Sequence, residues 1–521
     1  MPDGDGGYYA NVADHLRRGH GLVTDLSLMH QGLPSFPHPT PVYPLWPLLL
    51  GTCARVLPLE TVAIWLPTLL YFLTLLVVYR WGRALYPFEL LPKILPGLHA
   101  GHLAALIMGI NREFFWFSSL PYTEALAYCL LFGGLLRAQR LLPVPGLRGG
   151  LELGVWAGAM TLARSQMLLF ALALVGSAAI TLIAAKGQRR GLWLLLAGVC
   201  AAFALTVAPQ WIRLASMVEG STLAAFLRFD SAHASAGLSY LQVMVQTDSA
   251  VDFVRDRLGG LRVAFEPQGK YSYSQHFYLF PYALPIALVA FAVGFVGRMW
   301  RQWRSAGPGA MGRGLRSAPG WLAAPEHLNW LFIVLLATGS LVSLHLMHKQ
   351  MWSPWNFHMR HAIVCGIPFF LALVQMLRRP LLAAVGMAIL CVSIYQGGRA
   401  SVELLEQARR DARGHRIEPA LVDWIGSEAK KHEDLVVVTR FVQRLWQLTP
   451  PNVHYRMYYR QTTLQDLRIM MDELGSDFLV MPVGFRGAFE RERPAFRRHF
   501  RLVKRHRGFR VFAPIRRVHP G

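Results

Sequence analysis

The N-terminal stretch of the chain carries acidic groups that are suited to chemistry. Asp3 and Asp5 stand in a glycine-rich run, and Tyr8 and Tyr9 follow directly. Carboxylates are common general acids and bases, and a tyrosine hydroxyl both donates and accepts hydrogen bonds. The same Asp-Gly-Asp-Gly-Gly run also fits a turn followed by a helix cap, which is its structural alternative.

A second chemically rich stretch covers residues 345–361. His345 and His348 are three residues apart, but no carboxylate stands near them and the chain has no His-Glu-x-x-His motif, so a zinc site is disfavoured. Its cations fit an anion better, and its tryptophans also suit the aromatic belt of a membrane interface. Its other members are Lys349, Trp352, Trp355, His358, Arg360 and His361.

Composition predicts a polytopic membrane protein. Of 521 residues, 53% are hydrophobic and 16% are charged, and the apolar residues form long blocks such as 66–78 and 192–208. Soluble helices would show a polar face there. The formal net charge of +23 could indicate nucleic acid, but the arginines fall in short clusters between apolar blocks, as in oriented membrane proteins. The five cysteines stand singly, so neither disulfides nor a zinc site is predicted.

Apolar length predicts ten membrane spans. A short, proline-broken apolar segment at 43–57 precedes them and fits a helix at the interface. The spans cover residues 60–80, 97–115, 122–142, 151–164, 167–185, 191–215, 277–299, 328–347, 361–378 and 381–398.

Basic clusters orient these spans, because they occupy every second connection and cytoplasmic loops are rich in Lys and Arg. The N-terminal stretch, the other connections and the C-terminal tail are then expected outside. Glu124, Arg164 and Arg213 fall on this outer side, where charges that run against the orientation rule indicate a binding site. The cytoplasmic clusters are Arg80/Arg83, Arg137/Arg140/Arg148, Lys186/Arg189/Arg190, Arg298/Arg301/Arg304/Arg313/Arg316 and Arg378/Arg379.

The acidic stretch is expected outside, yet no apolar span precedes it. Either the chain inserts with its N-terminus outside, or a helix that belongs before Met1 is missing. The second explanation is favoured.

After Gly398 the composition becomes that of a soluble domain. Short buried strands alternate with helices, which predicts a small α/β domain over residues 399–521. Its many Arg and His side chains fit anionic headgroups, an anionic acceptor or an ordinary solvated basic face. The helices are expected at 402–412 and 463–473, and the strands at 435–439, 478–482 and 509–514.

Several short motifs follow one another in a characteristic order along nearly the whole chain. They are Asp5 with Tyr8-Tyr9, Gly21-Leu22, Pro44-Leu45-Trp46-Pro47, Pro121-Tyr122-Thr123-Glu124, Leu162-Ala163-Arg164-Ser165-Gln166, Pro209-Gln210-Trp211-Ile212-Arg213 and Arg360-His361. This order resembles the GT-C integral membrane glycosyltransferases, above all the protein O-mannosyltransferase-like enzymes and the bacterial aminoarabinose transferase. The chain departs from them in lacking their first transmembrane helix, and in reading Ala163-Arg164-Ser165-Gln166 where they have Thr-Arg-Pro-Glu.

The resemblance implies a polytopic α-helical fold of about ten or more transmembrane helices, with an extracytoplasmic α/β domain. Residues 1–59 would form the first extracytoplasmic loop with juxtamembrane helices, residues 60–398 the transmembrane domain, and residues 399–521 the periplasmic domain. Within the transmembrane part, 216–276 would be an outer loop and 300–327 a cytoplasmic linker.

The resemblance further implies an enzyme of the bacterial inner membrane that moves a sugar from a polyprenyl-phosphate donor to an extracytoplasmic acceptor. Because the lipid tail stays in the bilayer, the active site must lie at the outer membrane surface. An inverting transfer needs a carboxylate that deprotonates the acceptor hydroxyl. Asp5 matches the first-loop aspartate of the family and is the expected base, with Asp3 as the alternative.

The second acid implied by the resemblance is Glu124, which would orient substrate or help to hold a metal. Its structural alternative is the cap of a helix that begins at Thr123. Glu113 is a weaker rival because it neighbours Arg112 and can pair with it. The need for a divalent cation stays open.

Cations are needed to hold the phosphate as negative charge builds on it. Arg164, Arg213 and Arg360 are expected at outer helix ends, and the guanidinium fork suits phosphate oxygens. Arg164 lies in a tight hairpin between apolar halves, where idle charge is costly, so function is favoured. Arg213 fits snorkelling to headgroups equally well.

Further substrate contacts are expected by resemblance or by chemistry. They are Tyr8, Tyr9, His38, His348, Lys349 and His361, of which His38 stands where relatives often carry a cation.

A transporter or flippase of a lipid-linked glycan is the alternative function. Transporters tend to have internal repeats and charges at mid-membrane, and the spans show neither a repeat nor a buried acid. The chain also has no Walker or Rossmann glycine motif, which disfavours a nucleotide-driven pump. Which sugar moves, and whether the acceptor is a protein, a lipid or a polysaccharide, is not encoded in these patterns.

Overall fold

The computed structural model describes most of the helical part and the C-terminal domain. The described residues are 5–27, 36–40, 42–91, 95–164, 167–184, 189–217, 328–336, 366–378, 380–414, 419–440, 445–458, 462–483, 493–506 and 508–515. The predicted span at 277–299 and the stretch at 345–361 lie outside these residues.

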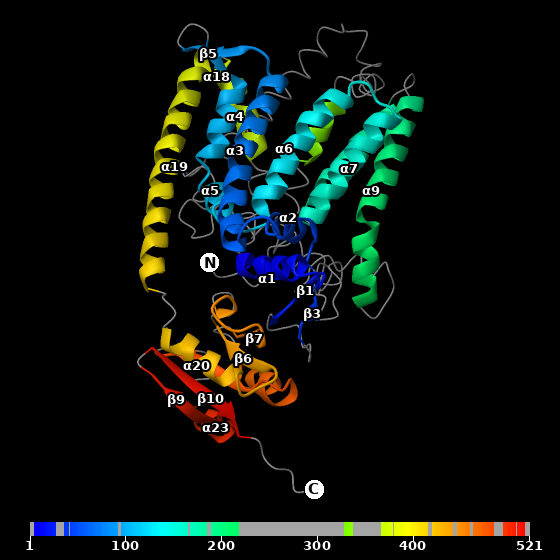
Figure 1. Ribbon diagram of the computed structural model, residues 1–521. Coiled ribbons are helices and arrows are strands. Elements are labelled where there is room, and N and C mark those ends of the chain that lie inside the picture. Colours follow the sequence, from blue (N-terminus) through cyan, green and yellow to red (C-terminus); the bar gives the residue numbers. More distant parts are fainter. Residues whose placement is uncertain are drawn as a thin grey trace, which may run out of the picture.

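Long apolar helices run side by side as a bundle (Figure 1). Three helices of the described part are long and apolar enough to cross a membrane: Leu59–Leu85, Arg189–Leu214 and Leu382–Glu403. They correspond to the predicted spans at 60–80, 191–215 and 381–398. The main helices are α3 (Leu59–Leu85), α6 (Glu124–Leu141), α7 (Leu147–Ala163), α8 (Leu168–Ala184), α9 (Arg189–Met217), α18 (Gly366–Leu377) and α19 (Pro380–Gly414).

The outward faces of α3 and α9 are apolar. Trp65 and Phe72 on α3 are 67% and 62% exposed, and Leu205 on α9 is 75% exposed. Large apolar side chains in such numbers are stable only against lipid. The chain is therefore an integral membrane protein.

Helix α7 packs closely on α9 through small residues. Gly150, Gly154 and Gly158 recur every fourth position, and a Cβ at any of them would collide with the backbone or side chains of α9. Without a hydrophobic driving force between helices in lipid, such close backbone approach supplies the packing energy.

The predicted span at 97–115 is divided in the structure. Strand β5 (Leu95–His99) pairs with β4 (Glu89–Leu91), and two short helices follow, α4 (Ala100–Gly109) and α5 (Arg112–Ser118). Asn111 causes the break, because its side chain accepts a hydrogen bond from the Phe114 backbone N–H at 2.8 Å and so caps α5.

The N-terminal segment lies across one end of the bundle (Figure 1). Helix α1 (Asp5–Arg17) packs on α2 (Leu45–Cys53) at Gly51, where a Cβ would lie only 2.8 Å from the Ala13 carbonyl oxygen. Strands β1 (Val23–Thr24) and β3 (His38–Pro39) form a short antiparallel pair after α1. We call this end of the bundle the α1 end.

The C-terminal domain is built on a mixed six-stranded sheet in the order β2-β7-β6-β8-β10-β9. Parallel pairing joins β2, β7, β6 and β8, and antiparallel pairing joins β8, β10 and β9. The three predicted strands are confirmed as β6 (Leu435–Thr439), β8 (Phe478–Pro482) and β10 (Phe509–Pro514). The remaining elements are β7 (Val453–Met457), β9 (Phe500–Arg505), α20 (Pro419–Ala429), α22 (Leu464–Arg468), a π-helix (Ile469–Glu473) and α23 (Arg493–His499).

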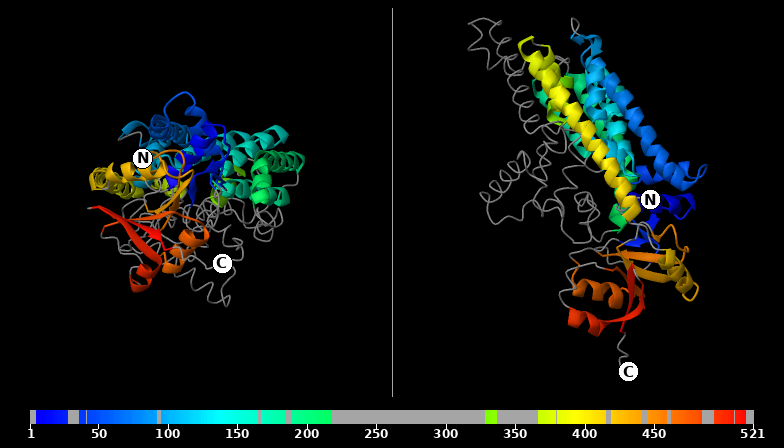
Figure 2. Two further views of the ribbon diagram at one scale, coloured as in Figure 1. Left: turned by 60° about the horizontal axis from the view of Figure 1, so that its bottom comes forward. Right: turned by 90° about the vertical axis from the view of Figure 1, so that its left-hand side faces the viewer.

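Two predicted helices have different extents in the structure. The charged helix expected at 402–412 is the end of α19, which continues from the bundle without a break. The helix expected at 463–473 is α22 followed by the π-helix. Figure 2 shows α19 running along the bundle to the side on which the C-terminal domain lies.

The edge strand β2 (Leu26–Ser27) comes from the N-terminal segment and not from the C-terminal part of the chain. The two regions also share one hydrophobic core, in which Tyr8 and Val12 of α1 pack with Tyr455 and Val480 of the sheet. The sheet thus fixes α1 against the end of the bundle.

Candidate active site

Helix α1 begins at Asp5, so this predicted base stands at a helix N-terminus. The structure describes the backbone of Asp5 and not its side chain, and Asp3 lies outside the described residues. Carboxylates at a helix N-terminus are stabilised as anions by the helix dipole. The helical assignment fits the alternative in which the Asp-Gly run caps a helix, and it leaves the chemical role of Asp5 a prediction.

Tyr8 and Arg213 meet on the segment at 40–42. The Tyr8 hydroxyl lies 2.6 Å from Thr40 Oγ1, and Arg213 Nη1 donates to the Thr40 carbonyl oxygen at 2.5 Å. Arg213 Nη2 donates to the Val42 carbonyl oxygen at 2.9 Å, and its Nε donates to Gln210 at 3.0 Å. These contacts make Arg213 a clamp that joins α9 to the segment after β3.

Tyr9 stands beside Tyr8 on α1. The two rings are 6.5 Å apart and nearly perpendicular, and Tyr9 packs between the core of the bundle and the core shared with the sheet. His38 lies in β3, two residues before Thr40, and its side chain is outside the description. The structure therefore brings the backbone of His38 close to the clamp.

Glu124 and Arg164 form a buried ion pair. Glu124 Oε1 lies 2.6 Å from Arg164 Nη1, and their side chains are 1% and 9% exposed. Thr123 joins the pair, because its hydroxyl lies 3.2 Å from both Glu124 Oε2 and Arg164 Nη1. The pair connects the start of α6 to the end of α7, although forty residues separate the two positions in sequence. The expectation that the predicted spans hold no buried acid is therefore wrong for the span at 122–142.

The ion pair is unlike a surface salt bridge. Removing two charges from water is expensive, so a pair at this depth persists only where each charge compensates the other. Thr123 does not cap α6 with its side chain, although its residue type favours a helix start. Glu124 therefore acts as the partner of Arg164 and not as part of a helix capping box.

Helix α2 connects the clamp to the ion pair. The buried indole of Trp46 donates from Nε1 to the Pro121 carbonyl oxygen at 2.8 Å, just before Thr123. Val42, four residues before Trp46, accepts from Arg213. The stretch from Val42 to Trp46 therefore contacts the Arg213 clamp at its first residue and the segment just before the Glu124–Arg164 pair at its last.

The remaining predicted contacts fall outside this arrangement. His348, Lys349, Arg360 and His361 lie outside the described residues. The side chains of Arg112 and Glu113, at the start of α5, are not described.

A network of histidines and carboxylates was not anticipated from sequence. Asp25 follows β1, and its Oδ2 lies 2.7 Å from His15 Nε2 on α1. Its Oδ1 lies 3.3 Å from His454 Nδ1 on β7, and His454 Nε2 lies 3.2 Å from Asp434 Oδ1. We call these four residues the junction network, because they join α1 to the C-terminal sheet.

Proton positions in the junction network follow from its carboxylates. Because a carboxylate only accepts, carboxylates near both nitrogens of His454 favour its doubly protonated form. Burial lowers the pKa of His454, but hydrogen bonds and attraction from Asp25 and Asp434 outweigh burial and raise it. Burial likewise raises the pKa of Asp25, but His15 and His454 outweigh burial and hold it below its ordinary range.

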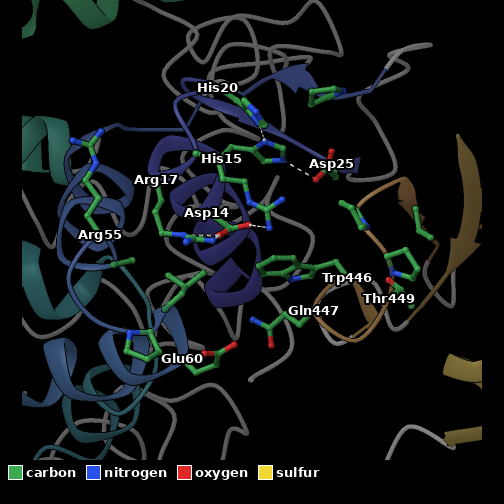
Figure 3. Close-up of a pocket in the computed structure, with 18 of the residues that line it drawn as sticks. Asp14, His15, Arg17, His20, Asp25, Arg55, Glu60, Trp446, Gln447 and Thr449 are labelled. Carbon is green, nitrogen blue, oxygen red and sulfur yellow. Dashed lines mark hydrogen bonds and ion pairs between the residues drawn. The ribbon is translucent and has the colours of Figure 1, made fainter. Parts of the chain in front are cut away.

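A cavity of about 700 Å³ lies beside this network (Figure 3). One wall is the end of α1 with Asp14 and Arg17, a second is the turn between α2 and α3, and a third is the 446–451 segment of the C-terminal domain. Figure 3 shows Arg55 and Glu60 on one side and Trp446 on the other. No residue of this cavity stood among the sequence predictions, because its walls come from both ends of the chain.

The described residues do not form a metal site. Within them, no group of three His, Cys, Asp or Glu side chains could hold an ion. Glu124, expected to orient substrate or help to hold a metal, is paired with Arg164.

The fold and these residues together describe an integral membrane protein that carries a charged site where its helical bundle meets a soluble mixed-sheet domain. No protein-family model matches the chain, and no curated protein matches it significantly.

Solved structures of similar fold exist. The chain is similar to the Archaeoglobus fulgidus oligosaccharyltransferase, solved with a tethered acceptor peptide that contains the NVT sequon, at a TM-score of 0.54 and 13% identity. The match covers 92% of this chain and 65% of that chain. The same enzyme in complex with zinc and sulfate matches at a TM-score of 0.54 and 13% identity, over 98% of this chain and 69% of that chain. ArnT from Cupriavidus metallidurans bound to undecaprenyl phosphate matches at a TM-score of 0.43 and 13% identity, over 98% and 94% of the two chains.

The chain has the GT-C fold of integral membrane glycosyltransferases, and the resemblance suggested by its motifs is confirmed at the level of fold. It spans about two thirds of the length of the archaeal oligosaccharyltransferase. Identity of 13% defines the fold and leaves the reaction to be argued from the site.

Proposed function

We propose that the chain transfers a sugar from a polyprenyl-phosphate donor to an acceptor outside the cytoplasm. The observation that carries this proposal is the gathering of charge at the α1 end of a GT-C bundle: the Glu124–Arg164 pair, the Arg213 clamp and the N-terminus of α1. A lipid-linked donor needs charged groups beside the bilayer and not in its middle. This end of the molecule provides them.

In the proposed reaction, Asp5 removes the proton from an acceptor hydroxyl, with Asp3 as the alternative base. The oxygen forms a bond to C1 of the sugar while the bond from C1 to the phosphate oxygen breaks. The electron pair leaves with polyprenyl phosphate, and the proton stays on the carboxylate. Attack opposite the leaving phosphate inverts the configuration at C1.

The leaving phosphate needs cations that are already in place. Arg360 and Lys349 are proposed for this role, together with His348 and His361. Arg164 is held by Glu124, so its proposed role is to orient the donor from a fixed position.

The remaining proposed contacts surround the acceptor and donor from α1 and α9. Arg213 holds the segment at 40–42, and through it the Tyr8 hydroxyl and the backbone of His38. Tyr9 would offer its ring beside them. No step is assigned to a metal.

We further propose that the α1 end faces the outside of a bacterial inner membrane. The arginines at 80, 83, 137, 140, 189 and 190 stand at the opposite ends of their helices, which is the pattern expected for the cytoplasmic side. Residues 399–521, with β2 added, would then act as an extracytoplasmic domain.

The test is release of polyprenyl phosphate from a polyprenyl-phosphate sugar by the purified protein. We expect release that depends on an acceptor and that does not occur with denatured protein. In sealed vesicles, movement of the intact donor across the membrane without release would contradict the proposal and support a flippase instead.

A further inference from the structure

The cavity beside the junction network has walls that suit a water-soluble ligand. Its α1 wall carries Arg17 and Arg18, both of which pair with the single carboxylate of Asp14, at 2.7 Å and 2.6 Å. One carboxylate neutralises only one of two guanidinium groups, so this wall keeps net positive charge. The side chains of Arg17 and Arg18 are 40% and 46% exposed, which leaves N–H groups available to a ligand.

The opposite wall adds one charge of each sign. Arg55 stands on the turn between α2 and α3 and Glu60 in the first turn of α3, and both are exposed. Within the described part of the chain, neither side chain makes a hydrogen bond or an ion pair. An exposed cation and an exposed anion at one cavity are suited to a ligand that has both a negative group and hydroxyl donors.

The third wall is aromatic. Trp446 is half-buried against the core of the C-terminal domain and lines the cavity (Figure 3). Its Nε1 is shielded from solvent and has no hydrogen-bond partner in the described structure. A flat apolar ring suits the apolar face of a sugar, because stacking buries both surfaces. The hydroxyl groups at the edge of the sugar can then form hydrogen bonds with the charged groups around the ring.

The floor of the cavity is rigid. Asp25 is fixed from two sides by His15 and His454, which also line the cavity. A site whose walls are already held in position loses little freedom on binding. A volume of about 700 Å³ is that of a small-ligand pocket and admits one or two sugar units.

We propose that this cavity binds an anionic saccharide, a sugar that carries a phosphate or carboxylate group, as a part of the acceptor remote from the reacting hydroxyl, since the cavity lies at the C-terminal end of α1 and Asp5 at its N-terminus. Arg17, Arg18 and Arg55 bind the anionic group, Trp446 stacks on the ring, and Glu60 accepts hydrogen bonds from hydroxyl groups. The acceptor role rests on the proposed function, whereas binding of an anionic saccharide does not.

Binding is tested on the full-length protein in detergent with three probes: glucose 6-phosphate, glucose and inorganic phosphate. Titrations followed by saturation-transfer NMR give the Kd of each probe. We expect glucose 6-phosphate to bind at least tenfold more tightly than glucose or phosphate alone. Equal affinity for phosphate would overturn the saccharide part of the proposal, and equal affinity for glucose would overturn the anionic part.

Variants test whether the binding is at this cavity. Arg55→Ala and Trp446→Ala should each raise the Kd for glucose 6-phosphate at least fivefold, and Trp446→Phe should restore most of the affinity by keeping a ring. The matched controls are Arg505→Ala on the exposed edge strand β9 and Trp193→Ala on the exposed face of α9. Unchanged Kd values for Arg55→Ala and for Trp446→Ala in folded protein would overturn the assignment of the site.

The donor-release assay separates the two proposals. Release of polyprenyl phosphate without any binding of glucose 6-phosphate overturns this inference and leaves the proposed function intact. Binding of glucose 6-phosphate without release in the presence of acceptor sugars overturns the transferase and with it the acceptor role, but not the anionic-saccharide site.

Discussion

Two charged clusters lie at the α1 end and differ in how they are enclosed. The Glu124–Arg164 pair is sealed inside the bundle between two helices of one domain. The junction network of His15, Asp25, His454 and Asp434 joins segments from opposite ends of the chain and reaches the surface at Asp434, whose side chain is 65% exposed. The Glu124–Arg164 pair is positioned to fix α6 against α7, whereas the junction network is positioned to respond to the pH of the solvent.

The largest effect is expected from breaking the sealed pair. Glu124→Gln leaves the Arg164 guanidinium buried without a counter-charge, which costs about 3–5 kcal/mol in the free energy of unfolding. Denaturant unfolding in detergent measures it. The matched control is Glu152→Gln, which breaks the half-exposed pair of Glu152 with Arg137 and should cost about 0–1 kcal/mol. Equal losses in the two variants would show that the Glu124–Arg164 pair is not sealed.

A smaller loss is expected at the junction. Asp25→Asn keeps the shape of the side chain but removes the charge that attracts two imidazoles, and hydrogen bonds to charged groups contribute about 1.5–3 kcal/mol. We expect faster hydrogen exchange in β2 and β7, which meet at this point, and unchanged exchange in α6. Equal acceleration in both regions would contradict the separation of the two clusters.

Helix α1 connects the clamp with the junction, and Gly51 tests that connection. Gly51→Ala places a Cβ 2.8 Å from the Ala13 carbonyl oxygen and pushes α1 away from α2, at a cost of about 1–2 kcal/mol. Gly398→Ala on α19 is the control, since its Cβ would meet nothing within 4 Å and alanine favours a helix. Gly51→Ala should weaken the junction, seen as faster exchange in β7, and leave the sealed pair intact. A Gly51→Ala variant as stable as Gly398→Ala would mean that α1 is free to shift.

The smallest effect concerns pH. The pKa of His454 is raised from its ordinary 6.5, so its contribution is complete below that pH and is lost as pH rises through the raised value. The pKa of Asp25 is lowered from 3.8, so its contribution is present above that pH and is lost only as pH falls through the lowered value. The junction should therefore be strongest between pH 3.8 and pH 6.5. At higher pH it should weaken by about 1 kcal/mol, the contribution of one hydrogen bond.

Unfolding across this pH range measures the effect, with His454→Gln as the control that should remove the alkaline loss. The groups that face His454 are Asp25 and Asp434, with His15 beyond Asp25. An alkaline loss that persists in His454→Gln would assign the titration to another group.

Apolar length predicted the three membrane-length helices of the described residues, because lipid imposes a length and a composition on a span. It did not predict the division of the span expected at 97–115. Short apolar runs between helices predicted β6, β8 and β10. Strand β7 was missed because His454 and Arg456 interrupt its pattern, although both are buried. They are buried by segments from the N-terminus: Phe36 stacks on His454 at 4.9 Å, and Arg456 lies over the same ring.

The roles predicted for the site residues stay predictions, and the structure adds pairings that the sequence did not predict. Sequence alone identified Arg164 as a charge in a costly position, and the resemblance pointed to Glu124 as a second acid. Their pairing depends on how α6 and α7 pack, which no local pattern contains. The junction network and the cavity were beyond prediction because they form only when β2 joins a sheet more than four hundred residues away.

The proposed transfer depends on an acid of the N-terminal segment acting at the α1 end. Single-turnover release of polyprenyl phosphate by the wild type and by Asp5→Asn tests this dependence, with Asp3→Asn as the matched variant. We expect Asp5→Asn to slow release by about 10²–10⁴ with donor binding unchanged, and Asp3→Asn to stay near the wild-type rate. Release by Asp5→Asn at the wild-type rate would refute the role of this acid.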